Sequence, residues 1–317
     1  MRRRNAISGW VCGLTVLFLA SAQENPRVTI VPRNRPERSS HPGSNIRLDV
    51  NLVLIPVTVT DPMGRPLSGL KRDVFQVFED GIKQRITWFA TEDVPVSAGV
   101  VFDASGSMER KLDKSREAVS QLFKTSIPGD EFFLVQFNTS PKLLCPFTTD
   151  IATVQNELLH IRAKGWTSLF DAVYLAIHQM RHAKNPRRAL LVLSDGGDNN
   201  SRYTEAEIRG LIRESEVSIY TIGMLGSDTT LRRIRLLREL AEETGGHFYP
   251  VHSVAQLPEV INRVSAALRN QYLLGYYPTN SQKDGKYRKV EIQLAPPPDF
   301  PPLHASWRVG YYAPASY

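Results

Sequence analysis

Polar residues that could bind a metal ion follow three apolar segments of the chain. Asp103, Ser105 and Ser107 stand at alternate positions after an apolar run, Thr167 lies in "GWTSLFDA" before a helical pattern, and Asp195 ends "RALLVLSD". Two carboxylates and three hydroxyls are hard oxygen donors, and no His or Cys joins them. The set favours Mg²⁺, with Mn²⁺ or Ca²⁺ as alternatives, over Zn²⁺ or copper.

These five donors leave room for a further ligand. They do not complete an octahedral shell, and two Asp charges only just neutralise a divalent ion. We therefore expect an open position that accepts one more anion, with a carboxylate of a partner protein as the natural ligand. The alternation in Asp-x-Ser-x-Ser directs three side chains the same way along an extended turn, and Gly106 lets the backbone approach the ion.

The elements that must position these residues alternate between strands and helices from residue 96 onward. Apolar strand segments such as "SAGVVFD", "RALLVLSD" and "VSIYTIGM" are separated by segments with helical apolar spacing. This rhythm predicts an α/β fold, a doubly wound and mostly parallel sheet with helices on both faces. Ligands of such sheets lie outside the carboxyl ends of the strands at the switch point. If the strands before Asp103 and Asp195 are neighbours there, the three loops converge.

The segments on either side of this region have β character. Residues 46–93 contain alternating apolar residues that change phase around Pro56, which predicts a bulge, and a hairpin signal at Asp80-Gly81. Three further strands are expected within 271–317. We predict that both segments form one small antiparallel β-sandwich, into which an α/β domain of residues 94–270 is inserted.

The N-terminal region has the features of an export signal. Residues 1–22 combine three arginines, an apolar stretch and a small-x-small ending, and residues 23–45 are rich in Pro, Arg and Ser, as in a flexible linker. We expect cleavage and a periplasmic or secreted protein without a transmembrane segment in the mature chain. An uncleaved N-terminal anchor is the alternative. Cys145, the one cysteine of the mature chain, is expected to be buried.

The three site segments together resemble the metal-ion-dependent adhesion site of von Willebrand factor A domains. "VVFDASGSM", "GWTSLFDA" and "LLVLSDGGDN" match its motifs in order, and the flanks "VTVTDPMGRPLSGLKRDVFQVFEDGIKQRITWF" and "YLLGYYP" are similar to VWFA-related acidobacterial domain proteins. The resemblance implies a Rossmann-like fold and an adhesion or interaction module without catalytic activity. It assigns Asp103, Ser105, Ser107, Thr167 and Asp195 as metal ligands and names no partner.

Two other interpretations of these residues remain open. Ser105 and Ser107 could cap a helix while Asp195 begins a turn. A haloacid-dehalogenase-like phosphohydrolase would use Asp103 as nucleophile with Mg²⁺. That enzyme class, however, needs a carboxylate two residues after the nucleophile as general acid, and Ser105 holds this place.

Outside this site, the sequence favours ordinary structural roles. His178 and His182 have helical spacing, but a zinc site needs further ligands, so we expect surface residues. The net charge of +7 is spread along the chain without a Lys/Arg block, which argues against nucleic-acid binding. We expect the tyrosines of the C-terminal strands to pack within the sheets: Tyr272, Tyr276, Tyr277, Tyr311 and Tyr312.

Overall fold

The computed structural model describes residues 52–91, 94–226, 229–296 and 300–315, which all belong to the unit Asp49–Tyr317. The predicted signal peptide 1–22 and linker 23–45 lie outside the described residues. No helix within the described part of the chain is long and apolar enough to span a bilayer.

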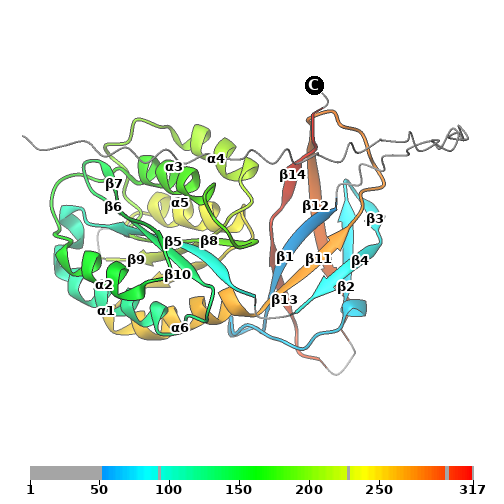
Figure 1. Ribbon diagram of the computed structural model, residues 1–317, viewed down its shortest axis with the longest axis horizontal. Helices are drawn as coiled ribbons and strands as arrows, with labels where there is room; N and C mark the ends of the chain where they lie inside the picture. Colours follow the sequence, from blue (N-terminus) through cyan, green and yellow to red (C-terminus); the bar gives the residue numbers. More distant parts are fainter. Residues whose placement is uncertain (1–51, 92–93, 227–228, 297–299, 316–317) are drawn as a thin grey trace, which may run out of the picture. The chain divides into compact units, whose positions relative to one another are not determined.

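A six-stranded sheet forms the centre of the α/β part (Figure 1). Its order is β10-β9-β8-β5-β6-β7, and every pairing is parallel except that of β7 with β6. All eight residues of β5 are buried, as expected for a strand covered on both faces. The strands are β5 (Val96–Asp103), β6 (Glu131–Phe137), β7 (Pro141–Thr148), β8 (Arg187–Ser194), β9 (Ser218–Met224) and β10 (Phe248–Val251).

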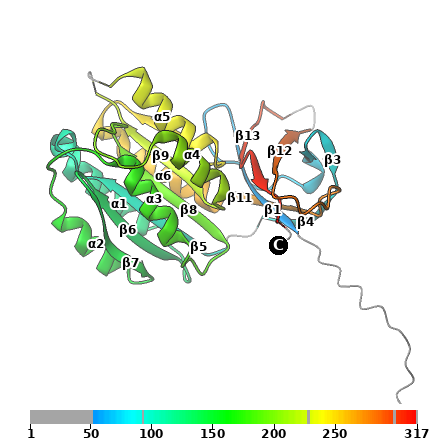
Figure 2. The ribbon, with the colours of Figure 1, turned by 90° about the horizontal axis from the view of Figure 1, so that it is seen from above.

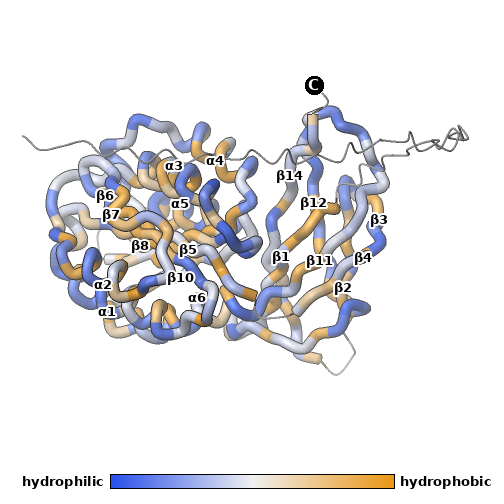
Figure 3. The backbone as a smooth tube through the Cα atoms, in the orientation of Figure 1, coloured by the Kyte–Doolittle hydropathy of each residue, from blue (hydrophilic) through white to orange (hydrophobic). Residues whose placement is uncertain are grey.

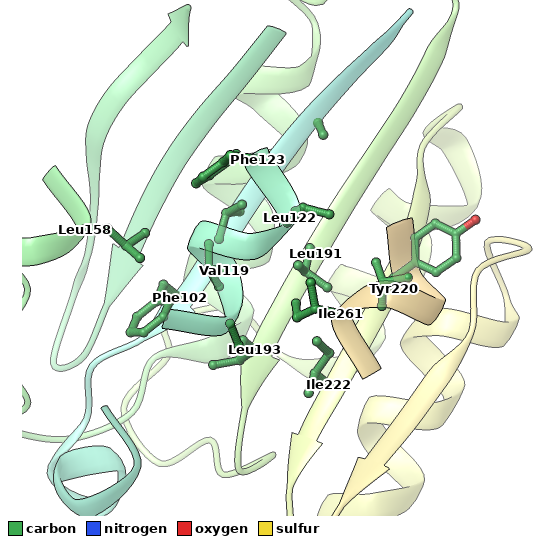
Figure 4. Packing of buried hydrophobic residues seen from close by; sticks show 14 of the residues in the cluster. Phe102, Val119, Leu122, Phe123, Leu158, Leu191, Leu193, Tyr220, Ile222 and Ile261 are labelled. Atoms are coloured by element: carbon green, nitrogen blue, oxygen red, sulfur yellow. The ribbon is translucent and has the colours of Figure 1, made fainter. Parts of the chain in front are cut away.

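Helices cover both faces of this sheet, which confirms the predicted fold class (Figures 1 and 2). One face is packed by α1 (Leu112–Phe123), α2 (Ile151–His160) and α6 (Leu257–Arg269), and the other by α3 (Leu169–Met180), α4 (Glu205–Glu214) and α5 (Leu231–Glu242). Figure 4 shows the first face, where Phe102 and Leu191 of the sheet meet Val119 of α1 and Ile261 of α6. Cys145 is buried in the same cluster, as predicted.

Local sequence signals account for several element boundaries. Thr204 and Glu207 form a reciprocal capping box at the start of α4, and Ser253 with Gln256 forms another at the short 3₁₀ helix η3 (Val254–Gln256) that leads into α6. Two further 3₁₀ helices, η1 (Arg72–Val74) and η2 (Gly106–Lys111), precede β2 and α1. Hydrophobic residues gather in the strands, whereas the connecting loops are mostly hydrophilic (Figure 3).

The winding of the sheet reverses at β5. The chain proceeds from β5 to β6 on one side, and after β7 it returns to place β8 on the other side. The register pairs Phe102 of β5 with Leu193 of β8, so both strands end at the same level. The loops that follow β5 and β8 therefore leave the carboxyl edge next to each other, at the switch point where ligands of open α/β sheets bind.

Two antiparallel sheets contain strands from both flanks of the α/β part. Their orders are β13-β1-β11-β4 and β14-β12-β2-β3, and they share one hydrophobic core. Asp80 and Gly81 have positive φ angles of 48° and 82° between β2 and β3, so the predicted hairpin is confirmed. The strands are β1 (Val53–Thr60), β2 (Phe75–Glu79), β3 (Ile82–Gln84), β4 (Ile86–Ala90), β11 (Gln271–Tyr276), β12 (Tyr287–Leu294), β13 (His304–Trp307) and β14 (Gly310–Tyr312).

The bulge predicted at Pro56 is wrong. Strand β1 runs through this residue, and its register with β11 continues without a shift from Val53 to Thr58. Pro56 is tolerated because β13 pairs only with the part of β1 that begins at Val57. The change of phase in the sequence has another cause. Leu52 and Leu54 lie on the outer face, 37% and 40% exposed, whereas the following valines face the core.

The last predicted strand is in fact two strands in different sheets. β13 pairs with β1 and β14 with β12, so the chain changes sheets between Trp307 and Gly310. A Cβ at Gly310 would lie 2.3 Å from the carbonyl oxygen of Arg288, so this close approach requires glycine. Trp307 and Tyr311 pack against the sandwich core as the alternation predicted, but Val309 lies between the two strands and is exposed. Alternation does not reveal a change of partner strand.

The prediction that the C-terminal tyrosines pack within the sheets holds for three of the five. Tyr272 and Tyr276 are buried and Tyr311 is half-buried, but Tyr277 and Tyr312 are 46% and 44% exposed. These two lie just beyond the end of β11 and at the end of β14, where the sheets no longer cover them.

Candidate metal centre

Asp103 forms the buried floor of the predicted site. It is the last residue of β5 and has no exposed surface. Its Oδ1 accepts a hydrogen bond from the backbone N–H of Ser105 at 2.8 Å, and its Oδ2 accepts one from the hydroxyl of Ser194 at 2.6 Å. The Ser194 hydroxyl in turn accepts from the N–H of Gly196 at 3.0 Å. The carboxylate is therefore fixed by both strands at the switch point.

The two serines of the first loop lead from this floor to the surface. Ser105 is buried, whereas Ser107 is exposed, and their hydroxyl oxygens lie 3.2 Å apart. The pair sits at the start of η2, where Ser105 precedes the first helical residue without capping it through its side chain. This disagrees with the alternative in which the serines serve only as helix caps.

Asp195 adds a second carboxylate at the same edge. It follows β8 directly, is 5% exposed, and accepts a hydrogen bond at Oδ1 from the N–H of Gly197 at 3.1 Å. Its Oδ2 lies 3.7 Å from a guanidinium nitrogen of Arg233. Oδ1 is therefore oriented by its own loop, and Oδ2 faces a cation.

The charge state of Asp103 reflects this neighbourhood. The pKa of Asp103 is raised to about 6, mainly by burial and to a smaller extent by the negative charge of Asp195, while hydrogen bonds from Ser105 and Ser194 oppose the increase. Ionising Asp103 in this buried position beside the Asp195 carboxylate is therefore unfavourable. A divalent cation at this edge would offset that cost.

Thr167 is held by the loop that carries Asp195. Its N–H donates to Asn199 Oδ1 at 2.9 Å, and its carbonyl oxygen accepts from the N–H groups of Asn199 and Asn200, both at 3.0 Å. The first loop is tied to the same segment, because the N–H of Gly106 donates to the carbonyl of Gly165 at 3.1 Å. The structure therefore brings the three predicted loops together through backbone contacts.

The β6–β7 turn supports the Thr167 segment from the other side. The Ser168 N–H and hydroxyl both donate to the Asn138 carbonyl at 2.8 Å, and the N–H of Trp166 donates to Thr139 Oγ1 at 3.2 Å. Gly165 has a φ of 77°, and a Cβ there would lie 2.4 Å from Thr139 Oγ1. This packing leaves the Trp166 side chain 63% exposed next to Thr167.

Three residues of this edge were not singled out from the sequence. Ser194 had a usable signal, because it is a hydroxyl directly before Asp195 at the end of a buried strand. Asn199 stands in the polar run "GGDNN", but nothing there indicates its reciprocal contact with Thr167. Arg233 lies 38 positions after Asp195 along the chain, and only the packing of α5 reveals its contact.

The residues present fit a hard divalent cation. Each oxygen of Asp103 accepts one hydrogen bond and keeps a second lone pair, and the hydroxyls of Ser105, Ser107 and Thr167 add neutral oxygens. No group of three or more His, Cys, Asp or Glu suited to a metal occurs among the described residues, so a site here must be completed by hydroxyls. The assignment of these five residues as ligands stays a prediction.

The two histidines on α3 have other surroundings. The ring of His178 stacks on Tyr174 with centroids 4.2 Å apart, and its Nδ1 lies 3.2 Å from the Tyr174 carbonyl oxygen. His182 is exposed beyond the end of the helix. The prediction of surface residues therefore holds for His182, whereas His178 is half-buried against Tyr174.

Comparisons with known proteins agree with the fold. The chain is 25% identical over 219 residues to human inter-alpha-trypsin inhibitor heavy chain H4, covering 63% of this chain and 23% of that protein. It is also 25% identical over 191 residues to an uncharacterised protein of Borreliella burgdorferi, covering 50% and 56%. The chain thus spans about a quarter of the length of the heavy-chain relatives.

Two solved structures show the same fold, and a family model identifies the domain. A von Willebrand factor type A protein from Catenulispora acidiphila has a TM-score of 0.50 at 14% identity, covering 85% of this chain and 75% of that chain. Proximal thread matrix protein 1 of the mussel byssus has a TM-score of 0.51 at 16% identity, covering 60% and 51%. The profile of the von Willebrand factor type A domain matches residues 99–263, slightly more than half of the chain. The chain therefore belongs to the von Willebrand factor type A domain family, whose members are adhesion and protein-interaction modules.

Proposed function

We propose that this protein is an exported, non-enzymatic binding module in which a divalent cation, Mg²⁺ first, joins an acidic residue of a partner protein to the carboxyl edge of the sheet. The residues that would hold the cation are Asp103, Ser105, Ser107, Thr167 and Asp195. The ion would supply positive charge and an open coordination position.

The observation that carries this proposal is the pairing of two buried carboxylates with three hydroxyl residues, of which Ser105 and Thr167 are buried and Ser107 reaches the surface. Asp103 and Asp195 are 0% and 5% exposed, whereas Ser107 is exposed. Buried carboxylates are costly unless they are neutralised. Two buried carboxylates with one exposed hydroxyl beside them suit an ion that is held from the protein side and approached from solvent by another protein.

The surroundings of the site also suit a partner. Trp166 stands next to Thr167 and is 63% exposed, although tryptophan is usually largely buried. Exposed tryptophans are over-represented among residues that dominate protein interfaces. We propose that Trp166 contacts the partner beside the carboxylate that reaches the cation.

Export rests on the sequence of residues 1–22. Its arginines, apolar stretch and small-x-small ending have the order of a secretory signal. A periplasmic or extracellular location would also expose the site to surface proteins as partners. Expression of the whole chain in a bacterial host, followed by N-terminal sequencing of the exported form, tests cleavage after Ala22.

Calorimetric titration of the full chain with Mg²⁺ tests the metal site. Asp103→Ala should weaken Mg²⁺ binding at least about 100-fold, since it removes one of two charged ligands, and circular dichroism should show an unchanged fold. Asp113→Ala, which removes an exposed carboxylate of α1, should leave the affinity unchanged. Equal affinity in Asp103→Ala and the wild type would refute the site.

A pull-down from periplasmic and extracellular extracts tests the partner. Capture in Mg²⁺ that is lost in EDTA and in Asp103→Ala identifies a metal-dependent ligand. Trp166→Ala should reduce capture about tenfold while leaving the Mg²⁺ affinity unchanged. Capture that is insensitive to EDTA would contradict the proposal, because the partner would then bind elsewhere.

A further inference from the structure

Arg233 directs a positive charge at one of the proposed metal ligands. It lies in the first turn of α5, and its Nη1 is 3.7 Å from Oδ2 of Asp195. The Arg233 side chain is 39% exposed, whereas that of Asp195 is 7% exposed. A partly exposed guanidinium therefore lies beside a buried carboxylate that is one of the proposed metal ligands.

Two glycines make this contact possible. A Cβ at Gly196, which has a φ of 78°, would lie 2.8 Å from the carbonyl oxygen of Arg233. A Cβ at Gly197 would lie 3.2 Å from Asp195 Oδ1 and 3.5 Å from Arg233 Cζ. Any side chain at position 197 would therefore contact both the carboxylate and the guanidinium. The loop after β8 is thus shaped to bring the first turn of α5 against Asp195.

Neighbouring arginines of the same helix have other contacts. Arg235 lies 3.7 Å from Glu239 one turn later, and the guanidinium of Arg238 lies 5.4 Å from the ring centroid of Phe248. Both contacts are made along α5 or on the sheet face rather than at the carboxyl edge. Position 233 therefore differs from other arginines of this helix in facing the candidate metal site.

We propose that Arg233 competes with the divalent cation for Asp195, so that metal binding exchanges a guanidinium for the ion. This inference rests on the proposed metal site. A guanidinium and a divalent ion that share one carboxylate oxygen repel each other, and the attraction of Arg233 to Asp195 must be given up before the ion binds. Arg233 would therefore hold the metal affinity below the value that the five ligands alone would provide.

Calorimetric titration of the full chain with Mg²⁺ alone at low ionic strength tests this competition. Arg233→Ala and Arg233→Gln should each bind Mg²⁺ about three- to tenfold more tightly than the wild type. Arg233→Lys keeps the charge and should stay within about twofold of the wild type, as should Arg235→Ala, which removes the same charge one half-turn away. Arg233→Ala should also lower the melting temperature in EDTA by more than Arg235→Ala does, because Asp195 loses its counter-charge.

The outcomes separate this inference from the proposed function. Mg²⁺ binding by the wild type with equal or weaker binding by Arg233→Ala and Arg233→Gln overturns the competition and leaves the metal site intact. Equal gains in Arg233→Ala and Arg235→Ala also overturn it, since the effect would then come from net charge. No binding by the wild type or any variant refutes the metal site, and the competition with it. Mg²⁺ binding that appears only in Arg233→Ala and Arg233→Gln supports both the metal site and the competition.

Discussion

The two parts of the chain each bury a carboxylate, and they treat it differently. Glu79 in the β-sandwich is 2% exposed, and its Oε2 accepts hydrogen bonds from the phenols of Tyr276 and Tyr311, both at 2.8 Å. Asp103 in the α/β part is equally buried and also accepts two hydrogen bonds. Beyond those bonds, however, Glu79 lies in the sandwich interior. Asp103 instead lies near the charge of Asp195 and next to Ser105, whose hydroxyl is 3.2 Å from that of the exposed Ser107.

Glu79, Tyr276 and Tyr311 form a cluster, the Glu79 cluster, in which both phenols donate to the carboxylate within the sandwich. Burial raises the pKa of Tyr276, and the hydrogen bond to Glu79 raises it further, so this phenol remains a donor. Burial and the same carboxylate raise the pKa of Tyr311. Burial of a carboxylate is therefore not by itself a sign of a binding site. A second negative charge and the exposed hydroxyl of Ser107 distinguish the site at the sheet edge.

The largest effect on stability is expected from removing the self-contained carboxylate. Glu79→Ala leaves two phenols without their acceptor and opens a cavity, which should lower the free energy of unfolding by about 3–4 kcal/mol. Urea unfolding followed by fluorescence measures this, and the Mg²⁺ affinity of the folded variant should equal that of the wild type. A loss under 1 kcal/mol would show that the cluster contributes little.

Asp103 should give the metal-free protein an unusual pH dependence. Folded Asp103 keeps its proton up to about pH 6, whereas the unfolded chain releases it near the ordinary value of 3.8. Between these values the folded state binds more protons, so the contribution of Asp103 to the free energy of unfolding falls by about 2–3 kcal/mol as pH rises. The free energy of unfolding, measured with urea in EDTA at pH 4, 5, 6 and 7 and compared with that of Asp103→Asn, isolates the contribution of Asp103. A wild-type curve parallel to the reference contradicts it.

Removing the charge of Asp103 should accordingly stabilise the protein without metal. At pH 7.5 in EDTA, Asp103→Asn should raise the free energy of unfolding by about 2 kcal/mol, because the amide still accepts from Ser105 and carries no buried charge. Excess Mg²⁺ should reverse the order, since only the wild type gains from binding. Destabilisation of Asp103→Asn in EDTA would mean that the carboxylate is as well satisfied as Glu79.

The smallest effect is expected from trimming one donor of the Glu79 cluster. Tyr311→Phe removes one hydrogen bond to a carboxylate that keeps Tyr276, and should cost about 1 kcal/mol. Tyr312→Phe, at an exposed neighbouring position, should change stability by less than about 0.5 kcal/mol and serves as the control. Equal effects of the two substitutions would show that Tyr311 contributes nothing to the cluster.

Features set by short-range chemistry were predictable from the sequence. The hairpin at Asp80-Gly81 follows from backbone preferences, and the adjacency of the loops after Asp103 and Asp195 follows from the rules of parallel winding. The strand path through Pro56 and the change of sheet before Gly310 depend on which partner strand is present, and alternation does not contain that information. The contacts of Asn199 with Thr167 and of Arg233 with Asp195 depend on how loops and helices pack.

The pairing of β4 with β11 has a consequence for how such a chain can be altered. Ala90 near the end of β4 is registered with Leu273 near the start of β11, and the whole α/β part lies between them in the sequence. The points at which the chain enters and leaves the α/β part are therefore neighbours on two paired strands. A different domain with closely spaced termini could be exchanged at these points while the ladder remains intact, which makes the sandwich a frame for recombination and engineered display.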